Sequence, residues 1–452
     1  MGAITLQQAA QWCGGKIDPK YSDVTFCGAN NDTRKLEQGQ LFVALQGARD
    51  GHDFIPDALK KGASAVLCTR CDGDYPAILV EDTRIALGDI ARGERQRIGC
   101  KVVGITGSVG KSTTKEMTAA VLKSTYRVGK SPVNHNNDIG LPMAILAMPE
   151  DTQVAVLEMG MNHFGEIAYL SAIAKPDVAV IVNIGTMHIE HLGSREGILQ
   201  AKLEILEGME KSGSVILNGD EPLLWNLHDT VPGVTYFGKQ NSQCAVSAIN
   251  IHSGEDTVTF DAVWENTVLP IKLHMEGEHY VEDALAAVAV GLKMGVLPEK
   301  IGESLSAFEN MQDRQEIYQA GGYTIIKDCY NAGPESMAAA LAVLGGKPGR
   351  KVAVLGEMLE LGDCTSAEHY KLGRMAAEKA DVVLAYGPNS ERVLKGAITG
   401  GMSDTRVSAF EDSQRLVAAL KQQARPGDVL LFKGSRGMRM ERILEAFLRE
   451  DK

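Results

Sequence analysis

Apolar residues in the middle of the chain occur in short continuous runs, each followed by a glycine or a polar turn. Between residues 100 and about 312 these runs include Val154–Glu158, Val178–Val182 and Val215–Leu217. Parallel strands covered on both faces read as continuous apolar runs. We therefore predict a parallel sheet and expect ligands to gather outside the carboxyl ends of its strands. Alternating polar and apolar residues over 244–275 predict an antiparallel appendage.

Both ends of the chain repeat this pattern on a smaller scale. The charged stretch 92–99 ends in Gly99 and predicts a linker. Together these patterns predict an α/β protein with three domains, at 1–98, 99–312 and 313–452. The flanking β-type runs lie at 41–45, 65–68 and 77–80, and at 351–355, 382–384 and 429–432.

Composition narrows the class of protein. The 452 residues are 44% hydrophobic and 23% charged, as in an ordinary soluble globular protein, and the formal charge of −12 argues against nucleic acid as a partner. No apolar run approaches the roughly 20 residues that span a bilayer, and no secretory signal is visible, so we expect no membrane insertion. Eight scattered cysteines favour reduced thiols in a cytoplasm. A metal or redox role for Cys68 and Cys71 is the minor alternative.

The strongest chemical signal is the segment 101–113, which reads KVVGITGSVGKST. A β-branched strand leads into a glycine turn whose backbone N–H groups can surround phosphate oxygens. Lys111 can reach the β- and γ-phosphates, and the Ser112 hydroxyl can hold Mg²⁺ at the start of a helix. The usual longer motif would need glycine at position 105, where Ile105 stands. An ordinary glycine turn is the alternative, but strand, turn and helix together favour nucleotide binding.

Several polar residues follow the predicted strands. Glu158 ends an apolar strand, where a carboxylate is costly unless it is paired or binds metal, so we expect it to hold Mg²⁺ opposite Ser112, either directly or through another ligand. A solvated carboxylate at a strand end is the alternative. His188 and His191 suggest zinc, but no third ligand lies close in the sequence. Lys202, on a predicted helix, reads from spacing alone as a solvated lysine. The amide-rich segment 134–142 reads from composition as a plain loop.

These motifs together resemble the Mur ligase family, ATP-dependent amide-bond formers that act on UDP-N-acetylmuramoyl peptides. The resemblance spans almost the whole chain. Segments 32–47 and 50–54 resemble a uridine-nucleotide-binding domain, and the C-terminal motifs resemble the members that add D-alanyl-D-alanine. The motif of the members that add the third residue, Asp-Asn-Pro-Arg, is absent. The residues that carry the resemblance are Thr106–Thr113, Asn134–Pro142, Glu158–Glu166, His188, Lys202, Asp328–Met337, Val354–Gly362 and Lys433–Glu441.

The resemblance assigns a role to each matched residue. It implies a central ATPase domain with a phosphate loop and a parallel sheet, between an N-terminal UDP-binding domain and a C-terminal Rossmann-like domain. Ser112 and Glu158 would bind one Mg²⁺, and His188 with a carbamylated Lys202 would bind a second; Lys111, His188 and Lys202 would serve catalysis. The residues implied for ATP are Gly107, Ser108, Val109, Gly110, Lys111, Ser112, Thr113, Asn136, Asn137, Asp283, Arg314, Asp328 and Asn331. Those implied for the UDP substrate are Thr33, Arg34, Gly47 and His52.

The sequence departs from the family pattern at two positions. Asp283 stands where the adenine-side motif has asparagine, and an ionised aspartate lacks the amide donor. Gly333 replaces the second asparagine of a Tyr-Asn-Ala-Asn-Pro motif.

The implied reaction joins D-alanyl-D-alanine to UDP-N-acetylmuramoyl-tripeptide through an acyl phosphate, in cytoplasmic peptidoglycan precursor synthesis, and we expect a monomer. A folylpolyglutamate or cyanophycin-type synthetase is one alternative, although these lack the uridine-nucleotide module. A regulatory switch that hydrolyses NTP without forming an amide is another.

Overall fold

The central sheet has nine strands and carries the phosphate loop at one edge. The structure is a computed structural model that describes residues 2–311 and 314–449, so the predicted boundary at 312/313 lies outside the described residues. The strand order is β15-β14-β13-β12-β11-β10-β7-β9-β8. These strands are β7 (Lys101–Thr106), β8 (Val128–Lys130), β9 (Val154–Glu158), β10 (Val178–Ile181), β11 (Ser214–Asn218), β12 (Val234–Gly238), β13 (Val246–Ser253), β14 (Val258–Trp264) and β15 (Thr267–Leu273).

In the sheet, the seven neighbouring strands β13, β12, β11, β10, β7, β9 and β8 pair in parallel. Strands β13, β14 and β15 pair antiparallel. Both findings confirm the predicted parallel sheet and its appendage. Ile105 of β7 lies beside Glu158 of β9, and Thr106 lies beside Ile181 of β10. The ends of these three strands therefore place the phosphate loop, Glu158 and the loop after β10 at one edge of the sheet.

Helices cover both faces of this sheet, which explains the continuous apolar runs. Val103 and Ile105 face a core shared with α4 (Lys111–Lys123) and α10 (His279–Lys293), whereas Val102 faces the opposite core. Successive side chains of a strand point to opposite faces, so both sets must be apolar when both faces are buried. The opposite core is covered by α5 (Gly140–Leu146), α6 (Glu166–Ala174) and α8 (Arg195–Leu203). The remaining short elements of this part are α7 (Ile189–Leu192), α9 (Pro222–Trp225), α11 (Pro298–Ser306) and the 3₁₀ turn η3 (Glu204–Leu206).

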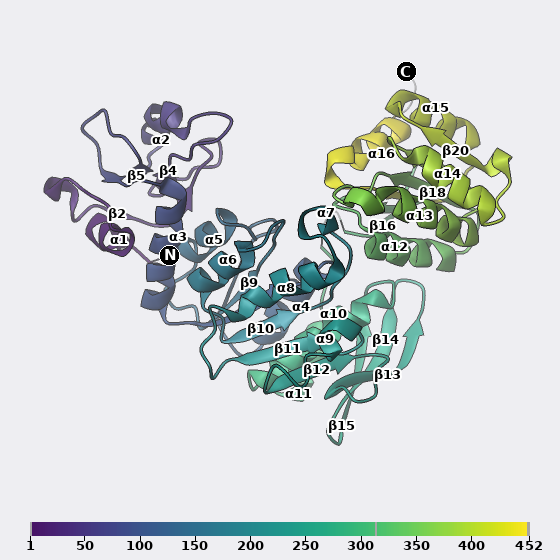
Figure 1. Ribbon diagram of the computed structural model, residues 1–452, viewed down its shortest axis with the longest axis horizontal. Helices are drawn as coiled ribbons and strands as arrows, with labels where there is room; N and C mark the ends of the chain where they lie inside the picture. Colours follow the sequence, from purple (N-terminus) through teal and green to yellow (C-terminus); the bar gives the residue numbers. More distant parts are fainter. Residues whose placement is uncertain (1, 312–313, 450–452) are drawn as a thin grey trace.

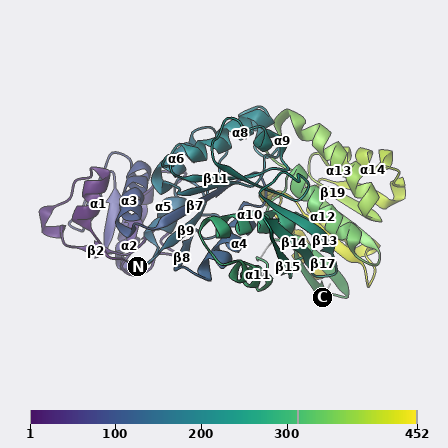
Figure 2. The same cartoon turned by 90° about the horizontal axis from the view of Figure 1, so that it is seen from below.

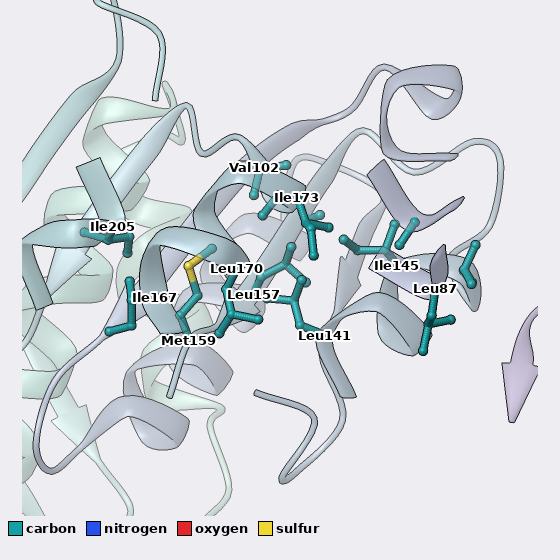
Figure 3. Close-up of a cluster of buried hydrophobic side chains, with 14 of the residues drawn as sticks. Leu87, Val102, Leu141, Ile145, Leu157, Met159, Ile167, Leu170, Ile173 and Ile205 are labelled. Carbon is teal, nitrogen blue, oxygen red and sulfur yellow. The ribbon is translucent and has the colours of Figure 1, made fainter. Parts of the chain in front are cut away.

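The N-terminal part holds a parallel four-stranded sheet of order β3-β4-β5-β6 and joins the central part through a long helix, α3 (Thr83–Ile98). Leu87 of this helix belongs to the same buried cluster as Ile145 of α5 and Ile173 of α6, as Figure 3 shows. The other elements are β1 (Ile4–Thr5), β2 (Thr25–Phe26), β3 (Ala29–Asn30), β4 (Leu41–Val43), β5 (Ala65–Cys68), β6 (Ala77–Leu79), α1 (Leu6–Cys13), α2 (Ile55–Lys60), η1 (Pro19–Tyr21) and η2 (Gly51–Phe54).

The prediction of a linker over 92–99 is wrong, because these residues form the second half of α3. The charges are held within the folded part of the chain: Glu94 is buried and accepts hydrogen bonds from Arg97, and Arg95 donates to the Ala174 carbonyl. Gly99 has a φ of +67° and ends the helix in the left-handed conformation that favours glycine. The charged stretch is therefore helical, and its glycine is a helix cap.

The C-terminal part is a second α/β unit with strand order β16-β17-β21-β18-β19-β20, in which only β16 runs antiparallel among the described strands. Its strands are β16 (Glu316–Ala320), β17 (Tyr323–Asp328), β18 (Lys351–Gly356), β19 (Val382–Tyr386), β20 (Val407–Phe410) and β21 (Val429–Lys433). One face is covered by α12 (Pro334–Gly346), α13 (Thr365–Lys379) and α14 (Ser390–Thr399), and the other by α15 (Ser413–Gln423) and α16 (Met440–Leu448). Short 3₁₀ turns are η4 (Gly362–Cys364), η5 (Asp404–Arg406) and η6 (Arg436–Met438).

The three parts lie in a row, with the N-terminal part at one end and the C-terminal part at the other in both views (Figures 1 and 2). Within the described part of the chain, none of the helices has the length and apolar character needed to cross a bilayer.

Candidate active site

A cavity of about 630 Å³ is lined by residues of both the central sheet and the C-terminal part. Most of the central residues follow strands β7 to β11 or lie at the start of α10, and most of the C-terminal ones precede β16, lie at the ends of β17 and β21, or lie on α12. The structure brings most of the implied nucleotide and metal residues to this one place. Those that line it are Ser108, Val109, Gly110, Lys111, Ser112, Thr113, Asn136, Asn137, Glu158, His188, Asp283, Arg314, Asp328 and Asn331.

The phosphate loop is braced by Asn183, a residue to which the sequence assigned no role. The Asn183 side-chain oxygen accepts hydrogen bonds from the backbone N–H groups of Ser108 and Val109, each at 3.0 Å. The Asn183 amide also donates to the Val109 carbonyl at 3.0 Å. In the sequence, the one indication of a role for Asn183 is that it is a polar residue that follows a buried parallel strand. The loop is therefore held in shape by a side chain from the neighbouring strand.

Gly110 is required at the start of α4 for two reasons. Its φ is +81°, and a Cβ at this position would lie 2.4 Å from an Asp283 carboxylate oxygen. Lys111 follows and donates to the carbonyls of Gly107 and Ser108, at 2.8 and 3.2 Å. Burial lowers the pKa of Lys111, while the nearby Glu158 carboxylate opposes this shift.

Ser112 and Glu158 form a buried hydroxyl–carboxylate pair. The Ser112 hydroxyl donates to Glu158 Oε2 at 2.7 Å, and the Asn136 amide donates to Glu158 Oε1 at 2.8 Å. From the C-terminal part, the Arg314 guanidinium donates to Ser112 Oγ at 3.0 Å and lies 4.1 Å from the centre of the Tyr330 ring. Hydroxyl and carboxylate oxygens are ligands that Mg²⁺ accepts, and it commonly takes the rest from phosphates and water. The pair therefore fits a magnesium ion.

Asp283 is buried, and its carboxylate accepts a hydrogen bond from the Thr114 hydroxyl at 2.8 Å. Burial raises the pKa of Asp283 to about 8, and Thr114, Arg314 and Lys239 only partly oppose the shift. Near neutral pH the side chain therefore carries a proton. A protonated carboxyl has both a donor and an acceptor, as the asparagine of the family motif has.

Lys202 is 1% exposed, so its interpretation as a solvated lysine is wrong. Burial and the nearby Lys111 charge hold the pKa of Lys202 well below its usual range. Nothing in the periodicity of α8 showed this, because the covering groups come from elsewhere in the fold. Lys202 itself does not line the cavity.

His188 contacts Glu360, which sequence reasoning did not find. His188 Nδ1 lies 2.6 Å from Glu360 Oε2 of the C-terminal part, and this contact lowers the pKa of the Glu360 carboxyl. His191 packs against His163 with ring centres 4.6 Å apart. Over residues 2–311 and 314–449, no three His, Cys, Asp or Glu side chains are grouped as a metal site. Cys68 and Cys71 are both free thiols, the first buried and the second exposed.

Lys433 is a further charged residue of the cavity, and the sequence assigned it no individual role beyond its place in a C-terminal motif. Its ammonium group donates to Asp328 Oδ2 at 2.6 Å and to the Asn331 carbonyl at 3.0 Å. It is 2% exposed, so its charge is balanced within the site by Asp328. The end of β21 thus orients two of the implied nucleotide residues.

Three segments of the chain match Mur ligase domains. Residues 24–95 match "Mur ligase family, catalytic domain", residues 105–291 match "Mur ligase middle domain", and residues 313–436 match "Mur ligase, glutamate ligase domain". The UDP-N-acetylmuramoyl-tripeptide--D-alanyl-D-alanine ligase of Bacillus subtilis is 42% identical over 98% of this chain and 97% of its own length. The chain belongs to the Mur ligase family.

Solved Mur ligase structures share the whole architecture. A MurF structure from Acinetobacter baumannii superposes with a TM-score of 0.91 at 32% identity and covers 100% of both chains. MurF from Thermotoga maritima in complex with ADP superposes with a TM-score of 0.81 at 31% identity, over 93% of this chain and 97% of that one. The three-part α/β arrangement is therefore that of a Mur ligase.

The four residues implied for the UDP substrate lie in the N-terminal part and do not line the cavity. His52 is buried, with Nδ1 2.6 Å from Asp50 Oδ1 and Nε2 accepting from the Thr69 N–H at 3.0 Å. Arg34 extends on the surface and pairs with Asp32 at 2.8 Å. His52 thus has a local structural role in this Mur ligase, and substrate binding by Thr33, Arg34, Gly47 and His52 stays a prediction.

Proposed function

We propose that this Mur ligase uses ATP to join D-alanyl-D-alanine to UDP-N-acetylmuramoyl-tripeptide in peptidoglycan synthesis. Relatives that bear this enzyme name match it over nearly their full length at 32–42% identity. The observation that carries the proposal is the cavity itself, in which a phosphate loop meets polar residues of the C-terminal part. An ATP-driven ligation needs a nucleotide site and an amine site that meet in one cavity, from which water can be excluded during the reaction.

Amide formation from a free carboxylate is uphill, so we propose that the carboxylate is first activated. The C-terminal carboxylate of the tripeptide attacks the γ-phosphorus of ATP to form an acyl phosphate and ADP. The amine of the dipeptide then attacks the acyl carbon, and phosphate leaves. Gly107–Thr113 would bind the phosphates, with Lys111 neutralising charge on the group in transfer. The C-terminal part excludes water, which would hydrolyse the acyl phosphate.

We propose that the residues fit two magnesium ions, which would supply charge neutralisation for the transferred phosphoryl group. Ser112 and Glu158 would hold the first, as their 2.7 Å contact and burial support. His188 and a carbamylated Lys202 would hold the second. A proton on His188 Nδ1 facing Glu360 would leave Nε2 for the metal, an arrangement common around metal-binding histidines.

The proposal also covers the other nucleotide contacts, the uridine-nucleotide site, the oligomeric state, the cellular location and the domain boundaries. Asn136, Asn137, Asp283, Arg314, Asp328 and Asn331 would contact the nucleotide. The N-terminal part would bind the uridine nucleotide. We propose that the enzyme acts as a monomer. We place the reaction in the cytoplasm, where ATP and nucleotide-linked precursors occur. The division into 1–98, 99–312 and 313–452 stays part of this proposal.

The deciding experiment measures the product. Purified protein is incubated with ATP, Mg²⁺, D-alanyl-D-alanine and a UDP-tripeptide that ends in either lysine or diaminopimelate, and the product is weighed by mass spectrometry. We expect one UDP-pentapeptide to accumulate in step with phosphate. Phosphate release that is independent of the dipeptide would instead support a nucleotide switch, and the proposed function would fail.

A further inference from the structure

The carboxylates that line the cavity are almost all engaged by neighbouring groups. Each of the following accepts a hydrogen bond or forms an ion pair: Glu158, Glu166, Glu221, Glu282, Asp283 and Asp328. Glu335 is engaged through one oxygen only, and its Oε2 atom is buried without a hydrogen-bond partner among the described residues. Of the described carboxylates that line the cavity, it alone has a buried oxygen in this state.

The other oxygen of Glu335 fixes the orientation of the side chain. Oε1 accepts from the Thr186 backbone N–H at 2.9 Å and from the Thr186 hydroxyl at 3.1 Å. Thr186 lies on the central part, in the loop after β10, whereas Glu335 lies in the first turn of α12. The carboxylate is therefore held at the junction between the two walls of the cavity.

This junction lies directly beside the phosphate loop. The Gly185 N–H donates to the Ser108 hydroxyl at 2.9 Å. A Cβ on Gly185 would lie 2.8 Å from the Glu335 carboxyl carbon, so the carboxylate approaches this backbone closely. Glu335 thus lies beside the phosphate loop, on the side that faces the C-terminal part.

A buried carboxylate oxygen without a partner is costly, and a cationic N–H donor is its best partner. ATP and the tripeptide carboxylate are anions and would be repelled. The ammonium group of the incoming dipeptide is the cation that must reach the acyl carbon, whereas the side-chain ammonium of a tripeptide lysine or diaminopimelate does not react. We propose that Glu335 Oε2 binds the ammonium group of the amine substrate and so selects a primary amine at this position. This assignment rests on the proposed function and names its amine-binding residue.

The test compares Glu335→Gln with a matched control, Glu378→Gln. Glutamine at position 335 keeps an acceptor for Thr186 but places an amide donor where the ammonium would sit. Glu378 lies exposed on α13, so the same substitution there removes a carboxylate charge outside the cavity. We measure KM for D-alanyl-D-alanine, ATP and Mg²⁺ separately, and we check folding by thermal unfolding. We expect E335Q to raise the dipeptide KM roughly ten- to hundredfold, because one charge-assisted hydrogen bond is lost. The KM for ATP and the Mg²⁺ requirement should change less than about threefold.

The control should change all three constants by less than about threefold. An active E335Q enzyme with an unchanged dipeptide KM overturns the assignment. So does a parallel rise in the Mg²⁺ requirement, because Oε2 would then serve a metal. If E335Q does not fold, Glu335→Asp provides the same comparison, since its shorter carboxylate should also raise the dipeptide KM selectively. A wild-type protein that makes no amide overturns the proposed function and this assignment together.

Discussion

At the scale of single residues, burial changes the chemistry of two side chains that look ordinary in the sequence. Lys202 lies on α8 and Asp283 on α10, with 1% and 4% exposure. Desolvation disfavours the charged form of each, which lowers the pKa of Lys202 and raises that of Asp283. Both therefore tend towards neutrality, the form in which an amine can react with carbon dioxide and a carboxyl can donate a hydrogen bond.

The proposed carbamate on Lys202 predicts a specific defect and its repair. Lys202→Ala should lower kcat about a hundredfold or more, since a metal ligand is lost. Short carboxylic acids such as formate should restore part of the activity, because they replace the missing carboxylate. Steady-state assays with and without the added acid measure both effects. Lys211→Ala, at an exposed lysine, is the control and should remain fully active without it. Full activity of K202A would refute the role.

Asp283 predicts a pH-dependent difference in stability. Its carboxyl has a pKa of about 8 in the folded protein and an ordinary value near 4 when unfolded, so stability from the protonated form is lost as pH rises between these values. Asp283→Asn removes this titration. The free energy of unfolding of D283N relative to wild type should therefore increase from pH 5 to 8, by at most about 1.4 kcal/mol per pH unit. Urea unfolding at each pH measures it, and a pH-independent difference would contradict the shift.

At the scale of elements, periodicity predicted strands well and the ends of helices poorly. The runs at 65–68, 154–158 and 351–355 are strands that are buried at every position except Lys351, and a linear pattern of apolar residues records such burial. The prediction of a linker over the second half of α3 was wrong because its charged residues suggested exposure to solvent. In the folded molecule, Arg95 and Glu94 have hydrogen-bond partners. Arg97, the partner of Glu94, is local, but the Ala174 carbonyl that Arg95 contacts lies 79 residues away, and no local pattern contains it.

The cap of α3 allows a clean test of this interpretation. Gly99→Ala adds a methyl group that meets no neighbouring atom, so its cost comes from the left-handed backbone alone. We expect a loss of about 1 kcal/mol in the free energy of unfolding, with activity unchanged. Gly346→Ala is the matched control, because it also meets no atom but has no positive φ. It should be neutral or slightly stabilising. Equal effects of the two substitutions would exclude a helix cap.

At the scale of the whole molecule, the site exists only where the central and C-terminal parts meet. The phosphate loop could be predicted from sequence because its residues are consecutive. Glu335 and Glu360 could not, because their partners lie on other elements, up to 172 residues away in the case of His188 and Glu360. For Asn183 the sequence showed a polar residue after a strand, but not its contact with the phosphate loop. Composition and spacing do not encode how two units pack. The resemblance to the Mur ligases supplied the residues that local chemistry left without a role.

A buried ion pair joins these two parts away from the cavity. Lys347 at the end of α12 pairs with Glu276, which follows β15, and both side chains are at most 10% exposed. Lys347→Met should leave an unpaired buried carboxylate and weaken the closed arrangement by roughly 1–3 kcal/mol. Small-angle scattering should then show a larger radius of gyration, and the double variant with Glu276→Gln should recover part of the change. An unchanged radius in K347M would contradict a role in closure.

The loop after β10 has one last consequence. Within six residues it steadies the phosphate loop through Asn183, receives the C-terminal part through Thr186, and presents His188. If nucleotide phosphates shift the phosphate loop, the shift can pass through this short segment to the contact between Thr186 and the C-terminal part. Bound ATP should therefore affect the position of the C-terminal part before the amine binds, which would make substrate binding ordered, with the nucleotide first.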